Sequence, residues 1–144
     1  MIEVAKRKAD ERKIDNIKYT QATIFDVTYE RESFDVVLAF NILHLLEDLQ
    51  KVLQRINDLL KPGGLFISST ACMGDKTVSR YRLLLFPLSV LGIVPSMKFL
   101  KRSELDESIT KGNFQIIETG RMDHKAPIFL IVAKKLQRTY QEEL

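Results

Sequence analysis

Residues Ser33–Thr70 constrain the fold more than any other stretch, because they match a strand, a helix and a second strand in succession. The first part, Phe34–Phe40, is almost continuously apolar, which is typical of a strand buried on both faces of a parallel sheet. The second part, Leu45–Leu60, repeats apolar residues every three or four positions, which predicts a helix with one apolar stripe. A Pro-Gly-Gly sequence then ends the helix and precedes a short strand, Leu65–Ser69. Parallel strands joined by a helix predict the α/β class, with helices on both faces of the sheet.

Weaker patterns precede this unit. Residues Ile2–Arg12 have apolar side chains on one side and charges around them, which predicts a helix. Lys18–Phe25 is a candidate strand that ends at Asp26, and the polar sequence after it predicts a loop.

The C-terminal part predicts one helix and two strands. Ser103 has the chemistry of an N-cap, and the helix that it opens is expected to end near Gly112, where glycine suits a left-handed C-cap. Phe114–Thr119 and Ile128–Ala133 are predicted strands, and the short link between them predicts that the last strand is antiparallel. No linker divides the chain, so residues 1–144 are interpreted as one domain.

Residues 73–100 are interpreted as an insert. Leu83–Leu100 is rich in apolar residues, but two prolines, a glycine and a lysine interrupt it. An unbroken helix of about 20 residues is therefore not expected, nor is stable insertion into a membrane.

Charge and cysteine content exclude some functions and locations. The 22 basic and 19 acidic residues give a net charge of +3, and the basic residues form no cluster, so no nucleic-acid partner is predicted. The single cysteine, Cys72, excludes an internal disulfide and fits a reducing cytoplasm. Charges follow Met1 at once, unlike in a signal peptide.

Catalytic motifs are sparse. The two histidines, His44 and His124, have no cysteine or carboxylate at ligand spacing, so no metal site is predicted. Neither a nucleophile elbow nor a phosphate-binding loop occurs, because the paired glycines follow a helix instead of preceding one.

Position then identifies the candidate site residues, because ligands of parallel α/β sheets lie beyond the carboxyl ends of the strands. Asp26 could accept a hydrogen bond from an amine or could simply cap a turn. Asn41 interrupts an apolar run and needs a partner for its amide, either backbone or ligand. His44 could be a general base, although a lone histidine at such a junction is more often a packing residue.

Several segments in this order resemble one family. The sequences IEVAKRKA, SFDVVLAFNILHLLED, INDLLKPGG and ITKGNFQII are similar to those of class I S-adenosylmethionine-dependent methyltransferases, particularly the small-molecule branch. The resemblance spans nearly the whole chain. It implies a Rossmann-like sheet in which Phe34–Phe40 and Leu65–Ser69 are the fourth and fifth strands, and in which the last strand lies between the fifth and the sixth.

The resemblance also implies a cofactor and its contacts. S-adenosylmethionine would bind with its adenine amine near Asp26, with the backbone of Val27 at the ring edge and with Phe25 nearby. Asn41 and Ile42 would border the methionine end of the cofactor.

The methyl acceptor would be a small molecule. His44 falls where some relatives contact the acceptor or assist its deprotonation. The insert occupies the place of a lid over the acceptor, and its Tyr81 and Phe86 suit an apolar or aromatic substrate. A surface that binds a partner or a membrane, or simple lid core, are the other interpretations of the insert.

One departure from the family is large. The family fold begins with a strand that carries a G-x-G-x-G loop and with a second strand whose terminal acid binds the ribose, and neither occurs in this sequence. Met1 aligns with an internal methionine of relatives, so the sheet is expected to be N-terminally truncated, without strands 1 and 2. Lys18–Phe25 and Phe34–Phe40 would then have unpaired edges. We expect them either to pair directly or to associate with another chain, which predicts a homo-oligomer.

Two functions therefore stay open. The first is methyl transfer in the parent protein, with this chain weak or inactive alone. The second is a non-catalytic fragment that acts as an association module. A nucleotide-binding dehydrogenase half fits the Lys-Pro-Gly-Gly segment poorly.

Overall fold

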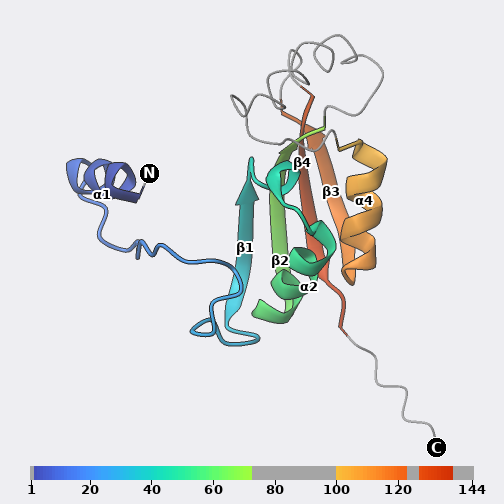
Figure 1. Cartoon of the computed structure of the whole chain (residues 1–144), viewed down its shortest axis with the longest axis horizontal. Helices are drawn as coiled ribbons and strands as arrows, with labels where there is room; N and C mark the ends of the chain where they lie inside the picture. Colours follow the sequence, from blue (N-terminus) through green and yellow to red (C-terminus); the bar gives the residue numbers. More distant parts are fainter. Residues whose placement is uncertain (1, 73–99, 123–126, 138–144) are drawn as a thin grey trace, which may run out of the picture.

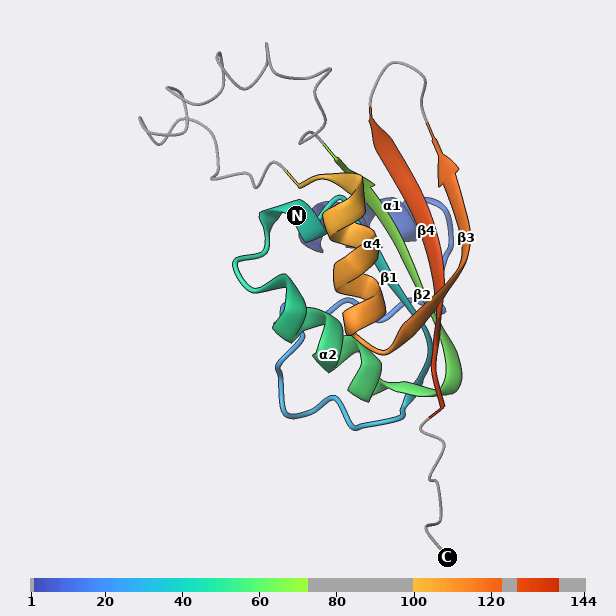
Figure 2. The ribbon, with the colours of Figure 1, turned by 90° about the vertical axis from the view of Figure 1, so that its right-hand side faces the viewer.

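The chain forms a four-stranded sheet with helices packed on one face (Figures 1 and 2). The computed structural model describes residues 2–72, 100–122 and 127–137. In chain order, the elements are α1 (Ile2–Glu11), β1 (Phe34–Phe40), the short 3₁₀ helix η1 (Leu43–Leu45), α2 (Leu49–Leu59), β2 (Leu60–Ala71), α4 (Arg102–Lys111), β3 (Phe114–Arg121) and β4 (Ile128–Lys135).

The strand order is β1-β2-β4-β3, and it confirms the predicted topology. Strands β1 and β2 are parallel, with Val37 opposite Phe66. Strand β4 lies between β2 and β3 and is antiparallel to both, with Phe66 opposite Ala133. The last strand is therefore inserted between the fifth and sixth strands of the resemblance, as expected. The carboxyl ends of β1 and β2 lie at the same edge of the sheet.

Helix α2 confirms the predicted crossover with shifted ends. The Asp48 carboxylate accepts a hydrogen bond from the Lys51 N–H at 3.0 Å, so the helix begins there and not at Leu45. The helix ends at Leu59, before the Pro-Gly-Gly sequence, which belongs to the first part of β2. Gly63 has a φ of +75°, which glycine adopts without strain.

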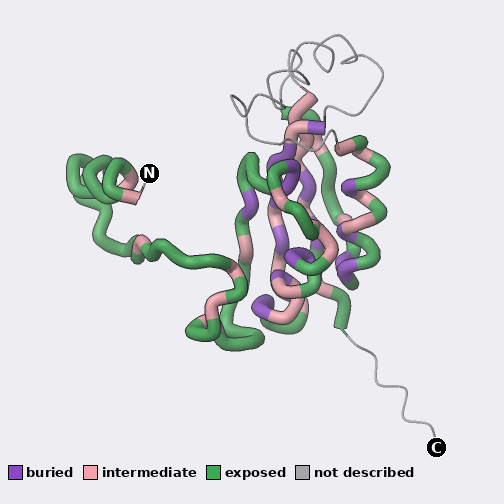
Figure 3. The backbone as a smooth tube through the Cα atoms, in the orientation of Figure 1, coloured by how far each residue is buried: buried purple, intermediate pink, exposed green. Residues whose placement is uncertain are grey.

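The core lies between α2, α4 and one face of the sheet. The rings of Phe66 and Phe114 have centroids 5.5 Å apart, and Leu53, Leu105 and Ile109 are fully buried around the same layer. Figure 3 shows that buried residues are concentrated in β2, β4 and the two helices, whereas α1 and β1 are mostly exposed.

The expectation that β1 is buried on both faces is wrong. Val36, Leu38 and Phe40 alternate along the strand and have exposed fractions of 43%, 57% and 56%. Val37 and Ala39 pack with the core, so the alternating Val36, Leu38 and Phe40 point to the other face of β1. No described helix covers that face of the sheet (Figure 2). Helix α1 lies apart from the sheet, beyond the β1 edge (Figure 1).

The predicted strand at Lys18–Phe25 is also wrong, because this segment is a loop. A strand exists only where a neighbouring strand takes up its backbone hydrogen bonds. The segment does not pair with β1, which is an edge strand. Instead, Ile24 packs against the core. Direct pairing of the two edges is therefore wrong, and association with another chain stays a prediction.

Helix α4 corrects two predicted caps. It begins at Arg102, with Lys101 as the N-cap instead of Ser103, and the Lys101 N–H donates to the Glu104 carboxylate at 3.1 Å. Gly112 has a φ of −76°, so it is not left-handed. Asn113 takes the left-handed conformation with a φ of 61°, which asparagine tolerates better than most residues.

Gly64 generates the first testable prediction. A Cβ atom there would lie 2.9 Å from the Lys61 carbonyl oxygen and 3.0 Å from that of Asp35. Because both are backbone atoms, we expect Gly64→Ala to lower the free energy of unfolding by about 1–3 kcal/mol in urea denaturation. Gly120 has open space around it, so Gly120→Ala is the matched control and should change stability by less than about 0.5 kcal/mol. Equal effects of the two variants would contradict the close approach.

Candidate functional site

An apolar hollow of about 590 Å³ lies beside the second half of β1. It is bounded by the loop before β1, the segment that follows β1 and the inner side of α2. Its lining residues are Ala22, Thr23, Ile24, Phe25, Val37, Leu38, Ala39, Phe40, Ile42, Leu43, Leu46, Val52 and Ile56. Pockets that bind small ligands have about this size and are mostly apolar with a few polar groups at their edges.

The structure brings together two of the predicted cofactor residues. Phe25 and Ile42 both line this hollow although 17 positions separate them in the sequence. Asp26 and Val27 follow Phe25 directly and do not line the hollow, and neither does Asn41. Val27 is 93% exposed. Of the five predicted cofactor residues, two therefore line the hollow, and the other three are sequence neighbours of those two.

Asp26 is a charged group in a local turn. Its Oδ1 accepts hydrogen bonds from the Thr28 N–H at 2.9 Å and from the Thr28 hydroxyl at 2.7 Å. These hydrogen bonds hold the pKa of the Asp26 carboxyl below its ordinary value, and the bond from the Thr28 backbone has the larger effect. The group is therefore an ionised acceptor at neutral pH, and its second oxygen has no hydrogen-bond partner among the described residues.

Asn41 has an unusual backbone at the carboxyl end of β1. Its φ is 53°, and its N–H donates to the Ser69 carbonyl at 2.8 Å, which ties the chain to β2 as it leaves the strand. Left-handed conformations of residues other than glycine concentrate at turns and functional sites. The amide side chain is exposed.

His44 lies in η1 and is buried, and it does not line the apolar hollow. Burial lowers the pKa of its imidazole below the ordinary value, so the ring is neutral at pH 7. Its Nδ1 has no hydrogen-bond partner in the described part of the chain. A buried polar atom without a partner is uncommon and calls for a ligand, a water molecule or a functional role.

Two residues that hold the loop were not predicted. Arg55 of α2 donates to the carbonyl oxygens of Ile24, Asp26 and Tyr29, and Lys51 lies 5.2 Å from the centroid of the Phe25 ring. Their place on the polar face of an amphipathic helix is typical of solvent-exposed residues. No feature of the sequence distinguishes them from other charged positions on that face.

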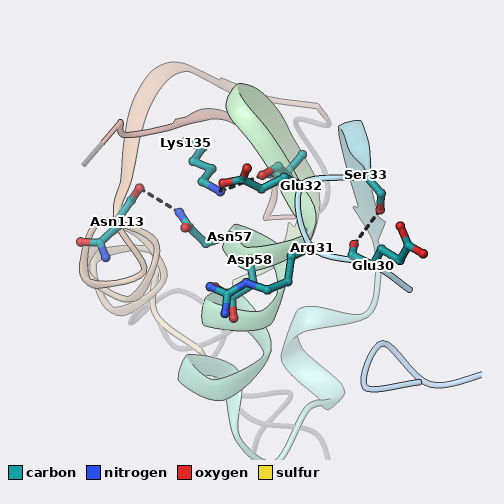
Figure 4. A network of polar contacts seen from close by, with 9 residues as sticks. Glu30, Arg31, Glu32, Ser33, Asn57, Asp58, Asn113 and Lys135 are labelled. Carbon is teal, nitrogen blue, oxygen red and sulfur yellow. Dashed lines mark hydrogen bonds and ion pairs between the residues drawn. The ribbon is translucent and has the colours of Figure 1, made fainter. Parts of the chain in front are cut away.

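A second hollow, of about 410 Å³, lies at the opposite end of β1 and β2. Its charged groups pair with one another (Figure 4): Arg31 binds Asp58 at 2.8 Å, and Lys135 lies 3.6 Å from Glu32. Lys135 also donates to the Leu60 carbonyl at 2.7 Å. These contacts tie the amino ends of β1 and β2 to β4, which is a structural role.

Some predicted features lie elsewhere. Tyr81, Phe86 and nearly all of the insert at 73–100 are outside the described residues. Within residues 2–72, 100–122 and 127–137, no group of three histidine, cysteine or acidic side chains could hold a metal ion. The same part of the chain contains no helix with the length and apolarity needed to cross a membrane.

Comparisons with known proteins agree on the family. Residues 1–137 match the family described as "Methyltransferase domain". Among curated relatives, the ubiquinone biosynthesis O-methyltransferase of Azorhizobium caulinodans is 29% identical over 127 residues, which cover 84% of this chain and 49% of that protein. The enzyme of the same name from Rickettsia typhi is 31% identical over 108 residues, which cover 71% and 42%. The chain thus spans about half the length of these relatives or less.

Solved structures show the same fold. The YcgJ protein from Bacillus subtilis superposes with a TM-score of 0.71 at 16% identity, covering 95% of this chain and 79% of that one. A geranyl diphosphate C-methyltransferase from Streptomyces coelicolor, solved with S-adenosyl-L-homocysteine, gives 0.70 at 13% identity, with 94% and 59% covered. The family match, the strand order and the antiparallel last strand agree, and the chain belongs to the class I S-adenosylmethionine-dependent methyltransferase family.

Proposed function

We propose that this chain is the part of a methyltransferase domain that receives the adenine end of S-adenosylmethionine and orients a small-molecule methyl acceptor. The observation that carries the proposal is the apolar hollow shared by Phe25 and Ile42 beside the carboxyl end of β1. The family and the relatives that methylate small molecules support the same function.

The residues present fit the adenine end of the cofactor. The hollow is lined mostly by apolar side chains, which suit the faces of a flat ring. The ionised Asp26 follows Phe25 directly and retains an oxygen that can accept from an exocyclic amine. We assign Asn41 and Ile42 to the methionine end.

In methyl transfer, the main task of the protein is to position the reacting groups. When bound, S-adenosylmethionine supplies a methyl group that its sulfonium has already activated for in-line displacement. The residues around it must then orient the acceptor and exclude water. We propose that His44 accepts the acceptor's proton at Nδ1, because this atom has no partner among the described residues and the imidazole is neutral. Tyr81 and Phe86 are proposed as acceptor contacts.

Binding by this chain alone is expected to be weak. The sequence contains no G-x-G-x-G loop and no second strand with a ribose-binding acid. Each charge-assisted hydrogen bond can contribute about 1.5–3 kcal/mol, so two such contacts correspond to a loss of about 150- to 20,000-fold in affinity. The lone cysteine fits our proposal of a cytoplasmic location.

The experiment that tests this function is calorimetric titration of the chain with S-adenosylhomocysteine. We expect a dissociation constant weaker than micromolar, and Asp26→Asn should weaken binding about a further tenfold, because it removes the charge of the acceptor. Asp35→Asn is the matched control, since Asp35 pairs with Lys61 at the other end of β1. Micromolar binding by the wild-type chain would contradict the expected weakness, and equal binding by Asp26→Asn would contradict the role of Asp26.

His44 generates a pH prediction. Its pKa in the folded chain lies below the ordinary value of 6.5, so the unfolded chain binds this proton more readily. The free energy of unfolding should therefore fall as the pH drops below about 6.5, and His44→Gln should flatten this part of the profile in urea titrations. Asp26 does not contribute to this part of the profile, because the pKa of its carboxyl in the folded chain lies below the ordinary value of 3.8.

His124→Gln is the control for this measurement, because His124 is the second histidine of the sequence. In this variant, the free energy of unfolding should still fall with decreasing pH below about 6.5, because His44 is unchanged. An unchanged slope in His44→Gln would contradict burial of the neutral ring.

A second candidate function is a non-catalytic association module. The observation that favours it is the outer face of β1, where Val36, Leu38 and Phe40 are exposed next to an unpaired strand edge. Such edges and apolar faces pair readily with another chain. We propose that copies of this chain associate through β1.

This proposal predicts self-association that depends on concentration in analytical ultracentrifugation. Val36→Lys should shift the chain toward the monomer, because it places a charge in the apolar face without changing a residue of the hollow beside Phe25. Ile117→Lys, on the opposite edge strand β3, is the matched control and should leave the equilibrium unchanged. A wild-type chain that is monomeric at all concentrations would refute association.

A further inference from the structure

Arg55 connects helix α2 to the loop that precedes β1. Its Nε donates to the Ile24 carbonyl at 3.2 Å, and its Nη2 donates to the carbonyls of Tyr29 at 2.8 Å and Asp26 at 3.4 Å. The three acceptors lie within six consecutive residues, 26 to 31 positions before Arg55. One side chain therefore binds the backbone at both ends and in the middle of the Ile24–Tyr29 segment, which is called the loop below.

These contacts fix the path of the backbone independently of the loop side chains. A planar guanidinium presents five N–H donors in a fixed arrangement, whereas a lysine ammonium is a compact point charge that cannot match three separated acceptors as well. In the described part of the chain, Arg55 forms no ion pair with a carboxylate, so its donors serve the loop.

The other long-range contacts of the loop are apolar: Ile24 packs against the core, and the centroids of the Tyr29 and Phe34 rings are 6.0 Å apart. The loop belongs to no strand, so no ladder holds it. Its internal hydrogen bonds are local: the Asp26 N–H donates to the Thr23 carbonyl at 3.1 Å, the Tyr29 N–H donates to the Asp26 carbonyl at 3.3 Å, and Thr28 binds the Asp26 carboxylate. Local turns define the shape of the loop but not its position relative to α2.

Lys51 adds a contact one turn earlier on the same side of α2. Its Nζ lies 5.2 Å from the centroid of the Phe25 ring, within the range of a cation–π interaction. Arg55 thus binds the backbone on both sides of Phe25, and Lys51 contacts the ring. Phe25 in turn lines the apolar hollow.

We propose that Arg55 is a positioning residue that holds the Ile24–Tyr29 loop in the conformation that receives the adenine ring. This inference rests on the proposed function and adds to it a residue that does not itself touch the cofactor. Without Arg55, the loop loses its fixed place beside β1, and its exposed local turns open more often. The cofactor must then order the loop on binding, which costs affinity.

The test combines two measurements on the same ¹⁵N-labelled chain. Amide hydrogen exchange of Tyr29 and Thr28 reports the anchoring of the loop, and NMR shift changes on titration with millimolar S-adenosylhomocysteine report binding. In Arg55→Gln we expect exchange of these amides to increase about 10- to 100-fold, with binding about tenfold weaker or more. The Val52 amide, which bonds to the Asp48 carbonyl within α2, should stay as protected as in the wild type.

Three further measurements separate positioning from general stability. Added guanidinium should restore part of both the protection and the binding in Arg55→Ala, because the small ion can fill the vacated site. Arg55→Lys should lie between the wild type and Arg55→Gln in both measurements. Arg31→Gln is the matched control, because Arg31 is an exposed arginine whose partner is the Asp58 side chain, and it should change neither measurement.

The outcomes are distinguishable. Loop release together with weaker binding and guanidinium rescue supports the proposal. Unchanged exchange in Arg55→Gln, or a released loop with unchanged binding, overturns it. If the wild-type chain shows no shift changes with S-adenosylhomocysteine while Arg55→Gln still releases the loop, the proposed function is refuted and Arg55 is a structural anchor only.

Discussion

The packing of α2 and α4 against one face of the sheet is the interaction on which the rest of the structure depends. Leu53 and Ile109, one from each helix, are fully buried over the Phe66–Phe114 pair. Because α2 connects β1 to β2 across this layer, the two strands must be parallel and must end at the same edge. The packing of the core therefore determines at which edge of the sheet Asn41, η1 and the candidate site lie.

The same packing leaves the molecule asymmetric. One face of the sheet is covered by helices, and the other presents exposed apolar residues of β1. Burying a large apolar side chain contributes about 1.5–3 kcal/mol, so this open face forgoes stabilisation that a covering element or a second chain would supply. The chain also spans only about half the length of the O-methyltransferase from Azorhizobium caulinodans. The exposed face of β1 is the observation behind the association that we propose.

Helix α2 has two roles on opposite sides. Its apolar side builds the core, and its charged side holds the loop that carries Phe25 and Asp26, through Arg55 and Lys51. The place of the loop therefore depends on the same helix that defines the sheet topology. Through these contacts, a segment without strand pairing contributes to a defined hollow.

The candidate site was predictable in part. The positions of Phe25 and Ile42 followed from the resemblance, and the structure places both around one hollow. The role of Arg55 was not predictable, because a charged residue on the polar side of an amphipathic helix has the same pattern whether it faces water or a loop. The burial of His44 and its effect on the pKa likewise depend on neighbours that are distant in sequence.

The sequence by itself determined the α/β class, the crossover and the antiparallel last strand, because apolar periodicity and turn residues are local properties of the chain. It also determined the family, through several short motifs in a fixed order. Tertiary structure alone decided that Lys18–Phe25 is a loop and that one face of β1 stays exposed. The physical reason is that strand pairing and burial require a partner surface, and the pattern of a segment shows what it can bury but not whether another element covers it.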